Sequence, residues 1–342
     1  MKKIQEAKIS GKRILVRVDF NVGIENGKVK ESFKIAAAKE TVDYLLARGA
    51  KVALLTHLGR PEGKVNLEFS LQQLASDAEL ILCEKITFVA DCVGEKVKEA
   101  LDNLQDGIVL LENVRFYAGD EANDADFAQQ LAENFDVFVN DAFSASHRDH
   151  ASVTGVAKIL PSYAGLRLQE EIHEMTIIKD HPVHPAVAII GGAKIETKVP
   201  LINNFEKTYD AVLVGSKIAM EAKEEGLVFS DKVILPIDYA EGGLDIGQET
   251  IEQFKNIIAG AKTIVWNGPV GKFEEKPYDA GTMAVLDAIV ASGAFSVVGG
   301  GESVEVLEEN NLLDEISFVS TGGGAMLEYL GGKILPGLEV LS

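Results

Sequence analysis

Short apolar runs alternate along the chain with segments whose apolar residues recur at helical spacing. Residues 108–111 are apolar throughout, and residues 135–139 are apolar apart from Asp136. Both runs lie between polar loops, which is typical of strands covered on both faces of a parallel sheet. Residues 34–47 carry apolar side chains on one helical face and stop just before Gly49, a common position for a helix end. This alternation predicts βαβ units and a parallel sheet.

The same rhythm occurs in both halves of the chain. Strands are predicted at 13–19, 52–56, from 88 onward, 108–111, 135–139, 186–192, 211–215, 263–269 and 295–301. Helices are predicted at 34–47, at 93–104 and at 163–179, and a further helix is predicted to begin after Ser70, which can act as its N-cap. The Asn26-Gly27 pair predicts a hairpin turn between the first strand and the first helix.

The length of 342 residues suits two domains rather than one. Pro182 and Pro185 must end the helix that precedes them, and such a helix is a natural interdomain connector. We therefore expect an α/β fold with two doubly wound, Rossmann-like parallel-sheet domains, residues 1–162 and 181–330. A hinge helix at 163–180 would join them, with a cleft between the domains.

The composition excludes several classes of protein. A formal net charge of −20 disfavours a surface for nucleic acid or for anionic membranes, because both need an extended cationic face. No apolar segment approaches a membrane-spanning length. The two cysteines, Cys83 and Cys92, cannot form a disulfide framework and are expected to be buried as small apolar residues. We expect a soluble, cytoplasmic protein.

Polar and cationic side chains follow the predicted strands of the first half. In open α/β sheets the ligand binds outside the carboxyl ends of the strands. Incidental charges on solvated loops are the alternative, but three of the six histidines follow strands, which favours a site. The residues at these strand ends are Asp19, Asn21, His57, Arg60, Asn113, Arg115, Asn140, Asp141, His147, Arg148 and His150.

Strands of the second half end in glycines instead. Glycine turns before helices expose backbone N–H groups to phosphate and let a flat base approach the chain. For any single cluster, a tight βα turn explains the glycines equally well, but five clusters together with Lys194 and Lys198 favour nucleotide binding. Neither a Walker A motif nor a G-x-G-x-x-G fingerprint is present. The clusters are 191–194, Gly215, 268–269, 299–301 and 321–324.

This division of residue types indicates a phosphotransferase. Arginine forks suit phosphate or carboxylate oxygens, whereas glycine turns and lysines suit the polyphosphate of a nucleotide. Phosphoryl transfer depends on in-line positioning and on charge neutralisation, so two closing domains, lysines and a carboxylate-held Mg²⁺ would be sufficient.

Eight ordered motifs then point to one family. The chain resembles phosphoglycerate kinases over essentially its whole length, which implies reversible transfer between 1,3-bisphosphoglycerate with MgADP and 3-phosphoglycerate with MgATP. The resemblance also implies a glycolytic, monomeric enzyme, with the tail at about 331–342 packed on the N-terminal domain. The motifs are RVDFN (17–21), HLGRP (57–61), LLENVRF (110–116), VNDAF…HRDHAS (139–152), GGAK (191–194), WNGPVGKFE (266–274), GGGES (299–303) and STGGGA (320–325).

The resemblance also implies roles for individual residues. On the substrate side Arg60, Arg115 and Arg148 would grip the 3-phosphate, and on the nucleotide side Lys194 would stabilise the transferring phosphoryl group. Glu274 would meet the ribose hydroxyls. The implied substrate-binding residues are Asp19, Asn21, Lys34, His57, Arg60, Arg115, His147, Arg148 and His150. The implied nucleotide-binding residues are Gly192, Lys194, Lys198, Gly215, Asn267, Pro269, Glu274, Gly300, Gly301, Glu302 and Ser303, with Glu302 on the Mg²⁺ side. Lys194, Lys34, Gly300 and Gly323 are implied in catalysis.

Three departures from the family pattern leave alternatives open. Lys34 replaces an arginine that the family uses on the transferred group, so the charge is kept but the fork is lost. Glu302 replaces an aspartate. Gly215-Ser216-Lys217 replaces three glycines, so adenine can sit differently, another base can be accepted, or Lys217 can reach a phosphate. Segments 67–82 and 227–246 are shorter than in the family.

Two other functions are consistent with these departures. One is a weakened paralogue that binds nucleotide or an anionic metabolite for regulation. The other is an acyl-phosphate kinase that acts on a different small carboxylate, although the substrate-side arginines and histidines all remain apart from the position of Lys34.

Overall fold

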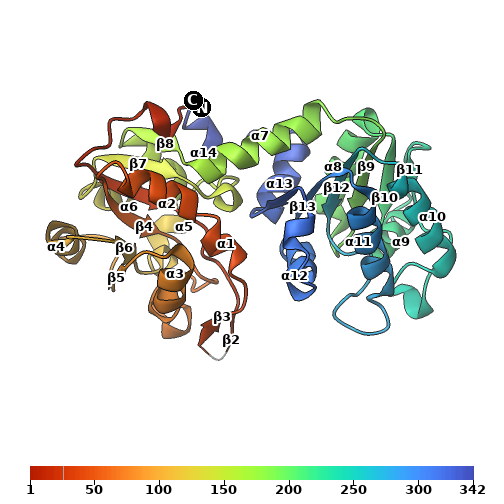
Figure 1. Ribbon diagram of the computed structural model, residues 1–342, viewed down its shortest axis with the longest axis horizontal. Coiled ribbons are helices and arrows are strands. Elements are labelled where there is room, and N and C mark those ends of the chain that lie inside the picture. Colours follow the sequence, from red (N-terminus) through yellow and green to blue (C-terminus); the bar gives the residue numbers. More distant parts are fainter. Residues whose placement is uncertain (26) are drawn as a thin grey trace. The chain divides into compact units, whose positions relative to one another are not determined.

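The computed structural model describes residues 1–25 and 27–342. The chain forms two compact units, one of Met1–Glu171 with Ile334–Ser342 and one of Ile172–Lys333. Each unit contains a six-stranded, fully parallel sheet with helices packed around it (Figure 1). The prediction of two doubly wound α/β domains is therefore confirmed.

The first sheet has the strand order β5-β6-β4-β1-β7-β8. Its register pairs Ile14 with Val52 on one side and with Val137 on the other. The order reverses direction at β1, so the loops after β1 and its neighbours β4 and β7 open onto one crevice. The strands are β1 (Arg13–Arg17), β4 (Lys51–Leu55), β5 (Ile86–Val89), β6 (Ile108–Leu111), β7 (Val137–Asn140) and β8 (Ser162–Ala164).

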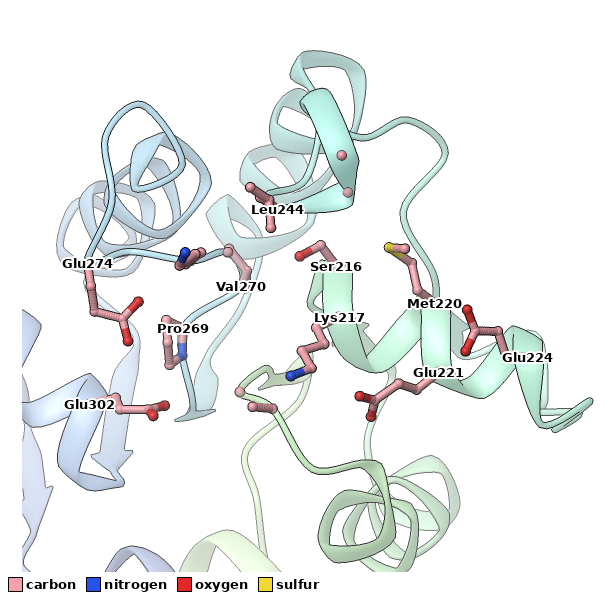
Figure 2. A pocket seen from close by; sticks show the side chains of 16 residues that line it. Ser216, Lys217, Met220, Glu221, Glu224, Leu244, Pro269, Val270, Glu274 and Glu302 are labelled. Atoms are coloured by element: carbon pink, nitrogen blue, oxygen red, sulfur yellow. The ribbon is translucent and has the colours of Figure 1, made fainter.

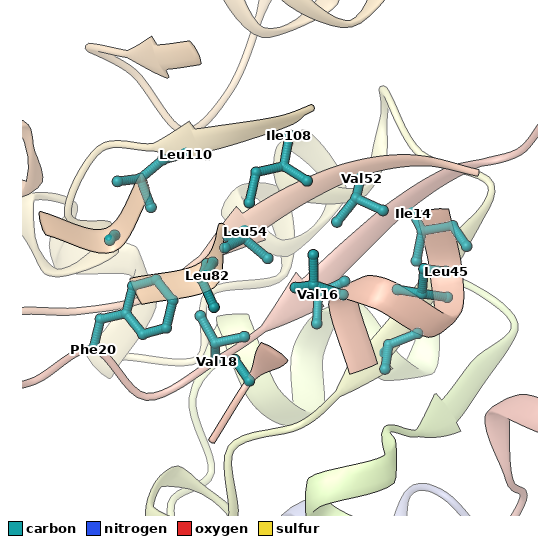
Figure 3. Close-up of a cluster of buried hydrophobic side chains, with 14 of the residues drawn as sticks. Ile14, Val16, Val18, Phe20, Leu45, Val52, Leu54, Leu82, Ile108 and Leu110 are labelled. Carbon is teal, nitrogen blue, oxygen red and sulfur yellow. The ribbon is translucent and has the colours of Figure 1, made fainter. Parts of the chain in front are cut away.

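Alternate residues of these strands build two separate cores, as the period of two requires. Ile14 and Val16 face one core with Leu54 and Leu82 (Figure 3), whereas Leu15 belongs to the other. The predicted double-sided burial of 108–111 is confirmed, since all four residues are buried. The helices of this unit are α1 (Phe33–Ala36), α2 (Lys39–Leu46), α3 (Ala75–Leu82), α4 (Glu95–Asn103), α5 (Ala118–Glu121), α6 (Ala125–Ala132) and α14 (Pro336–Glu339).

The second sheet has the order β11-β10-β9-β12-β13-β14, which is the Rossmann arrangement 3-2-1-4-5-6. Its switch point lies between β9 and β12, where a ligand crevice is expected. The strands are β9 (Ala186–Ile190), β10 (Ala211–Val214), β11 (Val233–Ile234), β12 (Thr263–Asn267), β13 (Phe295–Gly299) and β14 (Phe318–Ser320). The helices are α8 (Ile195–Thr208), α9 (Ser216–Glu224), α10 (Gln248–Ala259), α11 (Ala280–Ser292), α12 (Gly301–Glu309) and α13 (Gly323–Leu330).

Helix α7 (Leu166–Asp180) carries the chain from the first unit into the second. The short ribbon of β2 (Ile24–Glu25) and β3 (Lys28–Val29) is antiparallel, and Asn26 of the predicted turn lies outside the described residues. The remaining single turns are η1 (Ile4–Glu6), η2 (Leu67–Phe69), η3 (Leu71–Leu74), η4 (Val114–Phe116), η5 (Phe143–Ala145), η6 (Ala151–Gly155), η7 (Val156–Lys158), η8 (Glu241–Gly243) and η9 (Leu313–Glu315).

The C-terminal segment Ile334–Ser342 belongs to the first unit. The backbone N–H of Lys2 donates to the Leu341 carbonyl at 2.7 Å, and that of Gly337 donates to the Ser146 carbonyl at 2.8 Å. The tail ends in the one-turn helix α14, which has Pro336 at its start, where a missing N–H costs nothing.

Three local predictions are wrong. The single helix expected at 34–47 is two helices, because the Ala38 N–H bonds to Ile35 O, three residues back, and breaks the regular ladder. Tyr163 lies in β8 rather than in a helix, since residues 162–164 pair with β7 at the edge of the sheet, and α7 begins at Leu166. Cys83 is exposed, although Cys92 is buried as expected.

Across residues 1–25 and 27–342, no helix combines the length and the apolar character needed to cross a membrane.

Candidate functional site

Arg17, the last residue of β1, is the centre of a cationic cluster in the first unit. It is 1% exposed, and its Nη2 lies 3.0 Å from His57 Nδ1. Its Nη1 donates to Val18 O at 2.6 Å and its Nε to Ser152 Oγ at 3.3 Å. The sequence reasoning missed Arg17 as a site residue. The signal that could have revealed it is an arginine flanked by apolar residues 14–16 and Val18.

The contact with Arg17 fixes the state of His57. A guanidinium has only donors, so His57 Nδ1 accepts and the ring proton is on Nε2. Burial, assisted by the positive charges of Arg17 and Arg115, holds the pKa of His57 well below its usual range. His57 is therefore a neutral hydrogen-bond donor through Nε2.

The loop after β1 holds Lys34 at the end of the sheet. Asp19 Oδ1 accepts from the Asn21 N–H at 3.0 Å, and Asn21 Oδ1 accepts from the Gly59 N–H at 2.8 Å. Lys34 Nζ donates to Asn21 O at 3.1 Å and lies 3.7 Å from Asp19 Oδ2. These three predicted residues are thus brought together, and the loops after β1 and β4 are joined.

Arg115 is anchored to the same loop. Its Nη1 donates to Gly59 O at 2.8 Å, and its Nε lies 3.3 Å from Glu121 Oε1. Burial and the charge of Arg148 lower the pKa of Arg115 to about 10. Arg115 is thus partly desolvated beside a second positive charge, an environment that favours an anion.

Asp120 is a buried carboxylate beneath these cations and was not predicted. Its Oδ1 accepts from the Ser152 N–H at 2.9 Å, and its Oδ2 lies 3.8 Å from His150 Nδ1. Burial lowers the pKa of His150, and Asp120 partly opposes this. Of the other predicted residues in this unit, Arg60 is exposed, whereas His147 and Arg148 are half-buried.

Asp141 has a structural role, unlike the residues around it. It is buried, and its Oδ1 accepts from the Leu168 N–H at 3.1 Å, so it caps the first turn of α7. Burial raises the pKa of Asp141 to about 6.

The second unit contains a cavity of about 550 Å³ beyond the carboxyl ends of β9, β10 and β12 (Figure 2). It lies at the switch point of the sheet, where the Rossmann order places a ligand. The predicted residues that line it are Gly192, Pro269, Glu274 and Glu302. The remaining lining residues are Ala193, Ser216, Lys217, Met220, Glu221, Glu224, Gly242, Gly243, Leu244, Val270, Gly271 and Lys272.

The glycines around this cavity are of two kinds. A Cβ on Gly191 would lie 2.0 Å from Pro269 O, and one on Gly323 would lie 2.7 Å from the Gly300 Cα. These glycines, and Gly215 beside Val270, let loops pack together. A Cβ on Gly301 would meet nothing within 4 Å, so tight packing does not explain that glycine.

Lys198 is buried at the wall formed by β9 and β12. It is 6% exposed and donates to Asn267 Oδ1. Burial lowers the pKa of Lys198 to about 8, against an opposing effect of Glu302. Lys194, by contrast, is exposed at the N-cap of α8.

Asn267 and Ser303 tie the strand ends together. Asn267 Nδ2 donates to Gly299 O at 2.8 Å. Ser303 is fully buried, and its Oγ accepts from the Gly268 N–H at 2.8 Å. Both side chains are therefore engaged in holding the loops that surround Gly300.

The fold and the two clusters define a class of protein. One α/β unit gathers arginines and histidines suited to a small phosphorylated acid, and the other has a Rossmann-type cavity with glycine turns and lysines suited to a nucleotide. These two kinds of binding site are typical of a phosphotransferase.

Comparisons with known proteins identify the family. The family model described as phosphoglycerate kinase matches residues 4–224 and 217–333. Phosphoglycerate kinase of Borreliella burgdorferi is 39% identical over 383 aligned positions, covering 97% of this chain and 96% of the relative. That of Rubrobacter xylanophilus is 40% identical, with 99% and 97% covered. The chain belongs to the phosphoglycerate kinase family.

Solved structures agree with this assignment. Phosphoglycerate kinase from Coxiella burnetii superposes with a TM-score of 0.81 at 33% identity, covering 99% of this chain and 98% of the other. The enzyme from Pyrococcus horikoshii gives a TM-score of 0.87 at 28% identity, with 100% and 98% covered. The 383-position alignment exceeds the 342 residues of this chain, so the Borreliella relative has segments that this chain lacks.

Proposed function

We propose that the protein is an active glycolytic phosphoglycerate kinase. It transfers a phosphoryl group reversibly between 1,3-bisphosphoglycerate with MgADP and 3-phosphoglycerate with MgATP. The observation that carries the proposal is the match to this family over nearly the whole chain. No observation favours a regulatory paralogue, and the cationic cluster is intact apart from the exchange at Lys34.

The first unit binds the phosphoglycerate in this proposal. Arg60, Arg115 and Arg148 hold its distant phosphate, for which the planar fork of arginine is suited. His57 donates through Nε2, because Arg17 occupies Nδ1. The other contributors are Asp19, Asn21, His147 and His150.

The second unit binds the nucleotide in its cavity. Glu274 and Pro269 contact the ribose of the nucleotide. Lys198 and the loop that contains Gly300 and Gly301 bind its phosphates. Lys194 projects from the N-cap of α8 and stabilises the transferring group, where charge spreads over the equatorial oxygens.

Mg²⁺ enters this scheme as part of the nucleotide substrate. Residues 1–25 and 27–342 contain no group of three or more side chains that could coordinate a metal ion by themselves. A single carboxylate, Glu302, is consistent with Mg²⁺, which keeps several waters and binds substrate phosphates. The bound ion would neutralise phosphate charge.

Transfer requires the two half-sites to come into near contact. We therefore infer that the domains close on binding both substrates, with residues 163–180 as the hinge and a monomer in the cytoplasm as the working form. Closure also excludes water from the acyl phosphate.

A coupled assay with 3-phosphoglycerate and MgATP tests the proposal. The wild type should turn over, and Lys194→Ala should reduce turnover at least about hundredfold, because a transition-state charge is lost. Nucleotide binding without turnover above the Lys194→Ala variant would instead support the regulatory paralogue.

A further inference from the structure

One face of helix α9 forms a wall of the nucleotide cavity. Lys217, Met220, Glu221 and Glu224 all line the cavity, and their spacing places them on one side of the helix. Lys217 is exposed in the first turn, and its side chain extends into the cavity (Figure 2).

Lys217 differs from the other charged residues that line the cavity. The lining contains four carboxylates, Glu221, Glu224, Glu274 and Glu302, and two lysines. Lys272 pairs with Glu275 outside the lining. Lys217 has no ion pair or hydrogen bond from its ammonium group to any of residues 1–25 and 27–342. Its charge is therefore available to a ligand.

A carboxylate on the same helix face is already engaged. Glu221, one turn after Lys217, accepts at Oε2 from the Ile195 N–H at 3.2 Å. Ile195 is the first residue of α8. This contact ties α9 to the N-terminal end of α8, which follows Lys194, so the face of α9 that carries Lys217 lies beside the loop that bears the predicted phosphate-binding lysine.

From this placement we infer that Lys217 binds a phosphate of the nucleotide, the one nearest the ribose. The inference rests on the proposed function and adds a cation to it. Lys194 and Lys198 serve the transferring end, whereas Lys217 shares its cavity with Pro269 and Glu274 on the ribose side. The position is a glycine in the family pattern that the sequence resembles, so this contact is a property of this chain.

Calorimetric titration of ADP, AMP and adenosine tests the inference. Lys217→Gln should raise the Kd of ADP and AMP about tenfold, as expected for one charge-assisted hydrogen bond, and should leave adenosine unchanged. The effect should shrink as ionic strength rises. Lys223→Gln removes the same charge from the same helix at an exposed position outside the cavity lining, and should leave all three affinities unchanged.

Two results would overturn the inference. Unchanged ADP affinity in Lys217→Gln would show that the ammonium does not meet a phosphate. Equal losses for adenosine, or a changed preference between ADP and GDP, would assign Lys217 to the base. Either result would leave wild-type turnover intact, whereas a failure of the proposed function would appear as a wild type without turnover.

Discussion

At the scale of single residues, the site contains arginine and lysine side chains that differ in whether a carboxylate contacts them. Arg17 donates to a backbone carbonyl, a hydroxyl and an imidazole, and all three partners are neutral. The carboxylates of Asp120 and Asp19 oppose its charge only through space. Lys34 is different, because Asp19 and the Asn21 carbonyl already hold its ammonium.

Replacing Lys34 by arginine should increase turnover. An arginine can keep one contact to Asn21 O and present its second nitrogen to the transferred group, which a single ammonium cannot do. We expect turnover to rise about tenfold, with little change in the Kd of MgADP. Steady-state kinetics and calorimetry on Lys34→Arg measure both quantities, and unchanged turnover would mean that the lysine is already well placed.

Nucleotide binding should weaken at alkaline pH because of Lys198. Its folded-state pKa of about 8 lies below the ordinary value, so the positive charge is present below pH 8 and is lost as pH rises through it. The Kd of MgADP should increase about tenfold between pH 7 and pH 9.5. Lys198→Gln should bind more weakly and show no such pH dependence; an identical profile in both proteins would rule out Lys198 as the cause.

Sequence patterns identified most of these side chains as site residues, but they did not predict which of them are buried or what they contact. Lys194 and Lys198 both follow a glycine-ended strand, and their spacing alone does not tell which is buried. Burial of Lys198 results from its contact with Asn267, which is 69 residues away in the chain. Asp120 was missed for the same reason, since its role comes from a contact with Ser152, which is 32 residues away.

At the scale of elements, strand-to-helix glycine turns organise the nucleotide half. The sequence predicted the strands before these turns well, because buried parallel strands are uniformly apolar. It did not predict β8, a three-residue edge strand that is defined by its pairing with β7. It also did not predict the break between α1 and α2, which depends on one backbone contact with Ile35. It also did not reveal which glycines pack against other loops.

Alanine at Gly191 should destabilise the second unit strongly. The new Cβ would lie 2.0 Å from the carbonyl oxygen of Pro269, which is backbone and cannot rotate away. We expect a loss of about 3 kcal/mol in the free energy of unfolding, measured by denaturant titration. Gly301→Ala is the matched control and should stay within about 1 kcal/mol of the wild type, since its Cβ meets open space. Equal stability of the two variants would contradict the packing role of Gly191.

At the scale of the whole molecule, two units each supply half of the chemistry. Residues 1–171 and 334–342 contain the arginines and histidines of the cationic cluster, and residues 172–333 contain the glycine turns with Lys194 and Lys198. The sequence predicted this division from residue types alone. The return of the tail to the first unit was implied only by family resemblance, because nothing in the pattern of residues 334–342 identifies its partner.

Binding of both substrates should make the molecule more compact. In the proposed mechanism neither half-site completes the transfer alone, so we expect the ternary complex to bring them together. Small-angle X-ray scattering should show a smaller radius of gyration with 3-phosphoglycerate and MgADP than with either ligand alone. An unchanged radius would count against closure.

Trapping the acyl phosphate with hydroxylamine tests the central claim most directly. The carboxyl phosphate formed from 3-phosphoglycerate and MgATP reacts with hydroxylamine to give a hydroxamate. We predict hydroxamate only when both substrates are present, none with glycerate or acetate in place of 3-phosphoglycerate, and almost none with Lys194→Ala. Absence of hydroxamate in the wild type, or equal amounts from an acid that lacks the phosphate, would contradict the assignment.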